Sequence, residues 1–288
     1  MTTRINSFAK INFGLRILKK RDDGYHDLET IFYPVKLHDE ININIEHSDI
    51  NSNSVILKSN TSYIPLNKDN LCFKAAEKFF NSFRIKEYYR IEIDIVKNIP
   101  IGGGMGGGSS NAVSVIKFFI RYFNIDIEEN KETIMNLALS LGSDVPFFFL
   151  MKPCYAEGRG EKIKILRDFR IDYDILIVNP NLHISTKWAF EKLNYSPDFS
   201  KETLLDKVKI FDPLDKDAFV NDFEKIVFSK YNVLNEIKSE MLNAGAVYSS
   251  LSGSGATMFG LFARNKKSTL AKCFNLYKSK RYFTYISS

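Results

Sequence analysis

Residues 97–111 read Lys-Asn-Ile-Pro-Ile-Gly-Gly-Gly-Met-Gly-Gly-Gly-Ser-Ser-Asn, and six of the protein's 15 glycines lie within seven positions of this stretch. Just before it, Ile91, Ile93 and Ile95 alternate with polar residues, which predicts a half-buried strand. After it, apolar residues recur every three or four positions over residues 112–123, which predicts an amphipathic helix. We therefore interpret the stretch as a glycine-rich loop between a strand and a helix.

Such a loop is typical of a phosphate site, because glycine lets the backbone approach a ligand and the next helix offers its positive N-terminal end. A Walker A loop is excluded, since Gly108 is followed by Ser109 and not by lysine. Gly102, Gly104 and Gly107 meet the dinucleotide-binding spacing, but a second helix follows where that fold requires a strand ending in an acid. A flexible linker is disfavoured between a strand and an amphipathic helix.

The charge of the chain is unevenly distributed. Lys and Arg number 40 against 34 Asp and Glu, a net charge of +6, but seven basic and no acidic residues lie in 264–288. Residues 1–263 therefore carry 33 basic and 34 acidic residues. We interpret the basic stretch as solvated surface, and a nucleic-acid partner is disfavoured because no recognised binding motif accompanies the charge.

The same composition bears on the compartment. Cys72, Cys154 and Cys273 lie far apart without metal-ligand or disulfide spacing, which favours a reducing, cytoplasmic location. The longest apolar run, Val145–Met151, is far shorter than the roughly 20 residues of a membrane span, so no membrane association is expected.

The chain length of 288 residues suggests about two domains of roughly 150 residues each. A change of composition and Gly158-Arg159-Gly160 place the boundary near residue 160. Further strands are predicted around residues 41–45 and 173–178, and a turn between apolar runs over 247–263. Residues 181–245 are predicted to be mostly helical, with breaks at the prolines Pro197 and Pro213.

Three motifs, in this order along the chain, resemble those of the GHMP kinases, the superfamily of galacto-, homoserine, mevalonate and phosphomevalonate kinases. They are Ser7-Phe8-Ala9-Lys10-Ile11-Asn12, the glycine run from Pro100 to Ser110, and Ser252-Gly253-Ser254-Gly255-Ala256-Thr257. The resemblance implies an α+β fold of two domains, residues 1–160 and 161–288. It also implies a small-molecule kinase that uses ATP and Mg²⁺.

One branch of that superfamily is particularly similar. The segments that resemble it are Arg21-Asp22-Asp23-Gly24-Tyr25-His26-Asp27-Leu28 with Ile31-Phe32, and Leu141–Phe148. Members of this branch phosphorylate a hydroxyl group of a polyol linked to cytidine diphosphate, in the non-mevalonate route to isoprenoid precursors. The alternatives are another GHMP kinase, of the mevalonate, phosphomevalonate or homoserine type, and a non-catalytic nucleotide-binding protein.

The resemblance assigns the catalytic roles to Lys10 and Asp144, with the aspartate accepting the proton of the acceptor hydroxyl. A lysine beside it would stabilise the developing alkoxide and keep the carboxylate ionised. From the residues alone, Ser143 or Asp144 is interpreted as the cap of a helix that begins before Pro146, and Lys10 as a solvated lysine.

The resemblance also assigns the substrate-binding residues. Asn12 shares a strand face with Lys10 and would orient the acceptor. Tyr25 would stack on cytosine and His26 would hydrogen-bond to its edge. Phe32 belongs to the same set. The third motif would support the substrate diphosphate or the catalytic loop, or simply form a hairpin turn. The third-motif residues are Gly253, Ser254 and Gly255.

The ATP site implied by the resemblance consists of the glycine loop and three residues outside it. These are Pro100, Ile101, Gly102, Gly103, Gly104, Met105, Gly106, Gly107, Gly108, Ser109 and Ser110, with Asn70, Leu71 and Lys97 near adenine. Ser109 or Ser110 is expected to face Mg²⁺ or a phosphate oxygen.

Overall fold

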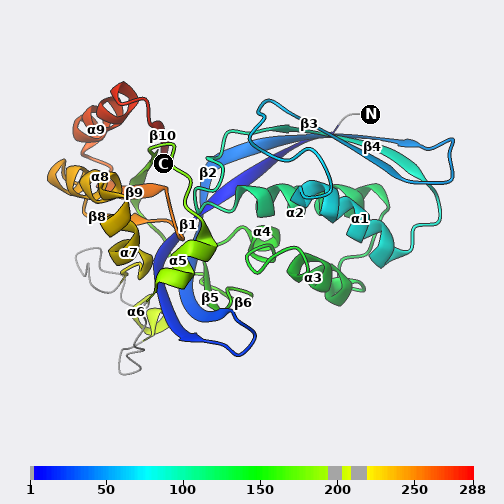
Figure 1. Ribbon diagram of the computed structural model, residues 1–288, viewed down its shortest axis with the longest axis horizontal. Coiled ribbons are helices and arrows are strands. Elements are labelled where there is room, and N and C mark those ends of the chain that lie inside the picture. The colour runs from blue at the N-terminus through cyan, green and yellow to red at the C-terminus, as the bar shows by residue number, and fades with distance from the viewer. Residues whose placement is uncertain (1–2, 194–202, 209–218) are drawn as a thin grey trace. The chain divides into compact units, whose positions relative to one another are not determined.

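The computed structural model describes residues 3–193, 203–208 and 219–288, and it mixes helices and strands as an α+β fold (Figure 1). The strands are β1 (Thr3–Lys20), β2 (His26–His47), β3 (Ser54–Ser59), β4 (Tyr89–Val96), β5 (Cys154–Gly158), β6 (Lys162–Ile165), β7 (Tyr173–Asn179), β8 (Tyr248–Leu251), β9 (Met258–Ala263) and β10 (Phe283–Ser287). The helices are α1 (Leu71–Phe83), α2 (Gly107–Tyr122), α3 (Lys131–Leu139), α4 (Phe147–Leu150), α5 (Thr186–Lys192), α6 (Leu204–Val208), α7 (Phe223–Lys230), α8 (Asn232–Asn243) and α9 (Lys267–Ser279). The fold class expected from the sequence is confirmed.

The chain forms two compact units, and each is assembled from separate segments. Unit 1 comprises Met1–Ala9, Leu37–Ile101 and Gly106–Met151, and unit 2 comprises Lys10–Lys36, Gly102–Met105 and Lys152–Ser288. The units are discontinuous because β1 and β2, of 18 and 22 residues, each contribute to both. The predicted domain boundary near residue 160 stays a prediction. The compact units are discontinuous and do not divide the chain at that residue.

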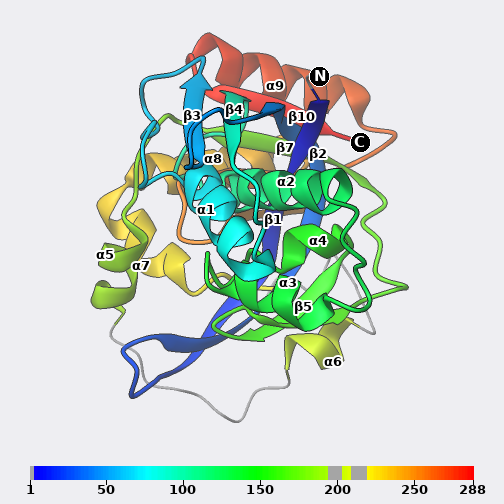
Figure 2. The same cartoon turned by 90° about the vertical axis from the view of Figure 1, so that its right-hand side faces the viewer.

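In unit 1, strands β2, β3 and β4 form a sheet, and α1 and α2 lie side by side (Figure 2). The antiparallel register of β2 and β4 pairs Ile41 with Ile95 and Ile43 with Ile93. Both alternating strands predicted from the sequence are thereby confirmed. Their apolar faces pack with one face of α2, where Phe119 is fully buried, and this apolar cluster fixes the direction in which α2 leaves the glycine loop.

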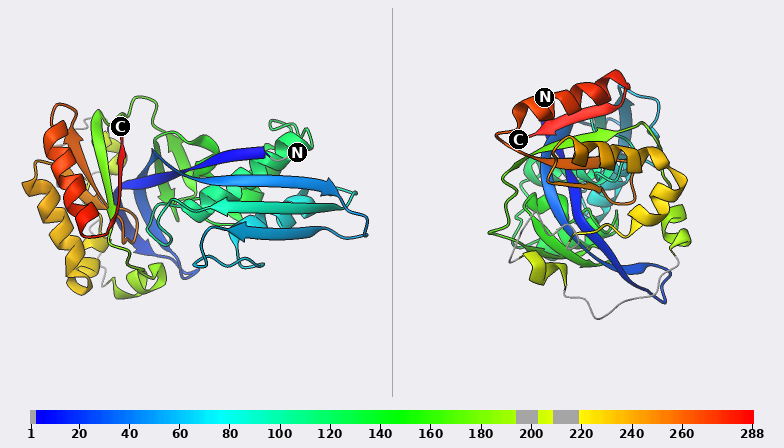
Figure 3. Two further views of the ribbon diagram at one scale, coloured as in Figure 1. Left: turned by 90° about the horizontal axis from the view of Figure 1, so that it is seen from above. Right: turned by 90° about the vertical axis from the view of Figure 1, so that its left-hand side faces the viewer.

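Unit 2 contains the four-stranded sheet β10-β7-β9-β8, with α8 and α9 on one of its faces (Figure 3). The predicted strand at 173–178 is β7, and the predicted turn over 247–263 joins β8 to β9. Residues 28–32 of β2 also belong to this unit and pair with β5. The two prolines that were expected to break helices in this half of the chain, Pro197 and Pro213, lie outside the described residues.

The predicted helix start at Ser143 or Asp144 is wrong. Helix α4 begins at Phe147 with Pro146 as its N-cap, and within the described structure no side chain caps it. The cap role fails because the Asp144 carboxylate bonds to another helix, as described below.

The basic stretch at the end of the chain is solvated, as predicted. All seven of its basic residues are exposed: Arg264, Lys266, Lys267, Lys272, Lys278, Lys280 and Arg281. In the described part of the chain, Cys72, Cys154 and Cys273 are buried free thiols. None of the helices described has both the length and the apolar character to cross a membrane.

Candidate active site

The glycine run passes from unit 2 into unit 1 and opens α2. Gly106 is the N-cap of α2, in the left-handed region at φ 69°, and its carbonyl accepts a hydrogen bond from the Ser110 N–H. A Cβ at Gly106 would lie 2.5 Å from Cζ of Phe148, so only glycine fits. Among the described residues no side chain caps this end of α2. The N–H groups of its first turn are therefore oriented to bind an anion.

Asp144 faces this helix start. Its Oδ1 accepts a hydrogen bond of 2.8 Å from the Ser109 hydroxyl, and its Oδ2 lies 3.3 Å from the ideal Cβ position of Gly106. Ser109 and Asp144 are both half-buried, whereas Val145, the next residue, is fully buried. The carboxylate is thus held at the glycine run and is only half-buried, an arrangement that suits a proton acceptor.

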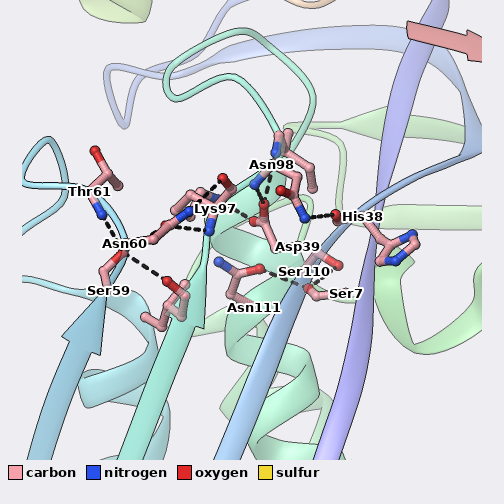
Figure 4. A network of polar contacts seen from close by, with 12 residues as sticks. Ser7, His38, Asp39, Ser59, Asn60, Thr61, Lys97, Asn98, Ser110 and Asn111 are labelled. Carbon is pink, nitrogen blue, oxygen red and sulfur yellow. Dashed lines mark hydrogen bonds and ion pairs between the residues drawn. The ribbon is translucent and has the colours of Figure 1, made fainter.

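The two serines that the sequence could not separate have different surroundings. Ser110 is buried, and its hydroxyl accepts a hydrogen bond of 2.8 Å from Ser7 of the first motif. Ser7 is also 2.8 Å from the Asn111 side-chain oxygen (Figure 4). Ser110 therefore joins the first and second motifs, while Ser109 is the serine that faces the half-buried carboxylate.

Of the three residues expected near adenine, two lie beside the first turn of α2. The ideal Cβ position of Gly107 is 3.1 Å from Lys97 Nζ, and that of Gly108 is 3.5 Å from Leu71 Cδ1. Asn70 instead caps α1, because its Oδ1 accepts from the Cys72 N–H at 2.8 Å.

Pro100 and Ile101 connect β4 to the glycine run in unit 1. The next four loop residues belong to unit 2, where Gly103 and Met105 are buried. An ideal Cβ at Gly102 would lie 2.7 Å from Nδ1 of His183. No sequence motif links His183 to this loop.

In unit 2, Lys10 is buried, contrary to the interpretation of this residue as a solvated lysine. Only 5% of it is exposed, and its Nζ donates to the Asn12 side-chain oxygen at 2.5 Å and to the Gly104 carbonyl at 3.1 Å. The Lys10 N–H donates to the Met105 carbonyl at 3.1 Å, and Nζ lies 5.0 Å from the centre of the Phe32 ring. A buried ammonium group fixed in this way provides a single, oriented positive charge.

Asn12 is held by two residues that the sequence did not single out. Its Nδ2 donates to the Thr30 hydroxyl at 3.0 Å, and its N–H donates to the Ser252 hydroxyl at 3.2 Å. The Ser252 hydroxyl in turn donates to the Gly104 carbonyl at 3.0 Å. The third motif therefore supports both Asn12 and the glycine run within unit 2.

The rest of the third motif forms a tight turn. Gly253 and Gly255 have φ of 58° and 94°, and the Ser254 hydroxyl lies 2.9 Å from that of Thr186. The Asn221 amide donates to the Gly253 carbonyl at 2.8 Å. These contacts indicate a supporting role for the turn.

The Tyr25 and His26 turn is built by ion pairs and aromatic contacts. Arg21 bonds to Asp23 and Asp27, and the Tyr25 ring, which is 55% exposed, lies 4.8 Å from the guanidinium carbon of Arg159. Nε of Arg159 is buried and has no hydrogen-bond partner in the described residues. The exposed face of Tyr25 is available to stack on a base.

His26 stacks on a residue that the sequence analysis did not assign. Its ring lies 4.8 Å from that of Phe190 in α5, at an interplanar angle of 20°. Burial, and then the charge of Lys20, lower the pKa of His26, so its imidazole is neutral at pH 7. The resemblance places Lys187-Trp188-Ala189-Phe190 where similar enzymes complete the cytidine pocket, but it assigns no contact to any of these residues, and the fold is what links Phe190 to His26.

The comparisons with known proteins agree with this geometry. Residues 70–152 match the model of the GHMP kinases N terminal domain, and residues 206–275 match that of the GHMP kinases C terminal domain. The sequence is 38% identical over 275 residues to a 4-diphosphocytidyl-2-C-methyl-D-erythritol kinase of Pelodictyon phaeoclathratiforme, covering 93% of this chain and 91% of the relative. It is 35% identical to a kinase of the same name from Clostridioides difficile, covering 99% and 95%.

Solved structures show the same relationship. A crystal structure of 4-(cytidine 5'-diphospho)-2C-methyl-D-erythritol kinase superposes with a TM-score of 0.75 at 26% identity, covering 99% of this chain and 98% of that one. The Methanococcus jannaschii mevalonate kinase shares the fold, with a TM-score of 0.71 at 16% identity over 100% and 98% of the chains. The fold, the glycine run that opens α2 beside a carboxylate, and these matches together define the class of the protein, a small-molecule kinase. The chain belongs to the GHMP kinases and, within them, to the family of the 4-diphosphocytidyl-2-C-methyl-D-erythritol kinases.

Proposed function

We propose that the protein transfers the γ-phosphoryl group of ATP to the C2 hydroxyl of 4-diphosphocytidyl-2-C-methyl-D-erythritol. The observation that carries this proposal is the Asp144 carboxylate, held by Ser109 at the glycine that opens α2. Phosphoryl transfer needs phosphates held in line, neutralised charge and an acceptor for the hydroxyl proton. The start of α2 would hold the phosphates, and Asp144 would accept the hydroxyl proton.

Lys10 and Asp144 are proposed to act on the same hydroxyl group. Within unit 2, Lys10 Nζ donates to the Gly104 carbonyl, and within unit 1 Asp144 lies against Gly106. The shared hydroxyl group is inferred from the resemblance of both motifs to those of the GHMP kinases. The ammonium group of Lys10 would stabilise the oxygen that attacks the phosphorus, while Asp144 accepts its proton. Lys10→Met should therefore lower kcat while the affinity for ATP is retained.

The acceptor is proposed to bind in unit 2 through its cytosine. Tyr25 offers an exposed aromatic face, and the His26 ring is fixed by stacking on Phe190. Through one of its ring nitrogens, a neutral imidazole can accept from the amino group or donate to the ring nitrogen on a cytosine edge. Asn12, fixed by Thr30 and Ser252, would orient the polyol.

Mg²⁺ is proposed as the companion of ATP. Among the described residues, no group of three or more His, Cys, Asp or Glu side chains is arranged to hold a metal ion. Mg²⁺ in kinases takes most of its ligands from phosphates and water, so one or two protein oxygens suffice. The Ser109 hydroxyl would supply one such oxygen, and the bound ion would neutralise charge on the phosphates.

One assay tests the proposed reaction. The full chain is given ATP and Mg²⁺ with the cytidine-linked polyol, mevalonate or homoserine, and ADP release is followed by a coupled enzyme. We expect turnover with the cytidine substrate alone. Turnover with mevalonate or homoserine, and none with the cytidine substrate, would overturn the assignment of the acceptor. ATP binding without turnover on any of them would favour a non-catalytic nucleotide-binding protein.

A further inference from the structure

Asp39 is a fully buried carboxylate with three polar contacts at the start of the glycine run. It lies on β2 immediately before Glu40, which pairs with Val96, and so faces Lys97 just past the end of the β2–β4 ladder. Its Oδ2 forms an ion pair with Lys97 Nζ, and the exposed fractions of the two side chains are 0% and 7%. Its Oδ1 accepts from the N–H groups of Asn98 at 2.7 Å and Ile99 at 2.8 Å.

Lys97 is also held from its other side, by Asn60. The Asn60 side-chain oxygen accepts from the Lys97 N–H at 2.8 Å, and its amide nitrogen lies 3.4 Å from the Lys97 carbonyl. Figure 4 shows Asp39 and Asn60 on opposite sides of Lys97. Both the main chain and the side chain of this lysine are thereby fixed.

The position of Lys97 Nζ at the start of α2 requires a negatively charged partner such as the Asp39 carboxylate. Nζ lies 3.1 Å from the ideal Cβ position of Gly107, the first residue of α2. A cation at a helix N-terminus is repelled by the helix dipole and by the unpaired N–H groups there. A buried carboxylate opposes that repulsion and holds the ammonium group at a point where ATP phosphates would meet it.

We propose that Asp39 is a positioning residue of the ATP site, acting through Lys97 and through the backbone of Asn98 and Ile99. The proposal rests on the proposed function, since it assigns the α2 start to ATP. Asp39 keeps Nζ beside Gly107 and fixes the chain that enters the glycine run. Its loss should weaken ATP binding and leave binding of the acceptor unchanged.

Asp39→Asn isolates the contact with Lys97, because the amide oxygen can still accept from both backbone N–H groups. We expect KM for ATP and the dissociation constant of ATP to rise roughly tenfold, while KM for the acceptor changes by less than about twofold. The ATP constant is measured by calorimetry on the full chain without an acceptor. This measurement remains valid if the cytidine polyol is not the substrate.

The second variant is the double substitution Asp39→Asn with Lys97→Met. It removes both charges of the ion pair, so no unpaired charge is buried and the fold is retained. If Asp39 acts through Lys97, the double variant should bind ATP as weakly as Lys97→Met alone. Glu224→Gln is the matched control, since Glu224 is also buried, bonds to a backbone N–H (Leu251) and pairs with a lysine, Lys238, in unit 2. It should lower the melting temperature without changing ATP affinity.

The results separate a positioning role from a purely structural one. If the Asp39→Asn variant has a lower melting temperature but binds ATP with wild-type affinity, the proposal is overturned. A double variant with wild-type ATP affinity would overturn it too. An equal rise in both KM values would also do so, because Asp39 would then act on the whole fold.

Discussion

The Ser109 hydroxyl donates a hydrogen bond of 2.8 Å to Oδ1 of Asp144, 35 residues further along the chain. An aspartate before a short helix normally caps that helix. Here α4 begins only at Phe147, and the carboxylate is directed to the first turn of α2 instead. Asp144 therefore does not cap α4, and its contact with Ser109 gives two predictions that test the proposed catalytic role.

Asp144→Asn should lower kcat by about 10²–10⁴-fold, because the amide cannot accept the proton of the acceptor hydroxyl. Its oxygen can still accept from Ser109, so the dissociation constant of ATP should stay within about threefold of the wild type. Steady-state kinetics and calorimetry measure the two effects separately. Asp126→Asn removes the same charge from an exposed turn of unit 1 and should leave kcat unchanged. An Asp144→Asn enzyme with full turnover would refute the catalytic role.

Ser109→Ala should reduce kcat about tenfold, because a hydrogen bond to a charged group is lost and the carboxylate can rotate. Ser109→Thr keeps the hydroxyl and should restore most of the rate. If the alanine and threonine variants were equally slow, crowding at this position, and not the hydrogen bond, would be the cause.

Phe190→Ala should raise KM for the acceptor up to about tenfold, since the ring that fixes His26 is lost and an aromatic pair contributes about 0.5–1.5 kcal/mol. KM for ATP should not change. Trp188→Leu alters the same helix on the side that contacts Lys230 and should leave both constants unchanged. Equal rises for ATP and the acceptor after Phe190→Ala would indicate a general loss of folding.

The acceptor should bind independently of pH above about 6.5 and more weakly below it. Burial and Lys20 lower the pKa of His26 below its ordinary value of about 6.5, so the folded protein takes up this proton only at lower pH. The unfolded chain is protonated first, so acid also lowers stability through this group. KM for the acceptor is measured from pH 5.5 to 8. His26→Gln cannot titrate, and a wild-type profile identical to that of His26→Gln would contradict this role.

How much of this site follows from the sequence depends on how local each contact is. The glycine loop, the alternating isoleucines and the apolar face of α2 are local patterns, so they predict both elements and their order. The pairing of Asp39 with Lys97 depends on the register of β2 and β4, 58 residues apart. No local pattern contains that register.

The acceptor side of the site was less predictable for the same reason. His26 and Tyr25 are recognisable through their motif, but Phe190 and Thr30 act only because folding brings them to His26 and Asn12. Lys10 was interpreted from the residues as solvated because lysine is usually exposed, and the Gly104 carbonyl that binds it is 94 residues away.

Gly104 allows the sharpest test of the contact between the glycine run and the third motif in unit 2. Its φ is 75°, and an ideal Cβ would lie 2.0 Å from the Ser252 carbonyl oxygen, which cannot move without disturbing β8 and its turn. Gly24 has a similar φ of 83°, but among the described residues nothing lies within 4 Å of its ideal Cβ. Gly24→Ala should therefore cost only the left-handed strain, about 1 kcal/mol of unfolding free energy.

Gly104→Ala carries the same strain and a steric clash as well, so we expect a loss of about 3 kcal/mol or more. The Ser252 hydroxyl and Lys10 Nζ both donate to the Gly104 carbonyl, so the displaced backbone should also lower kcat. Urea unfolding and steady-state kinetics on both variants measure these effects. Equal stability losses at Gly24 and Gly104 would show that the third motif does not pack on the glycine run, because conformational strain alone would then account for both.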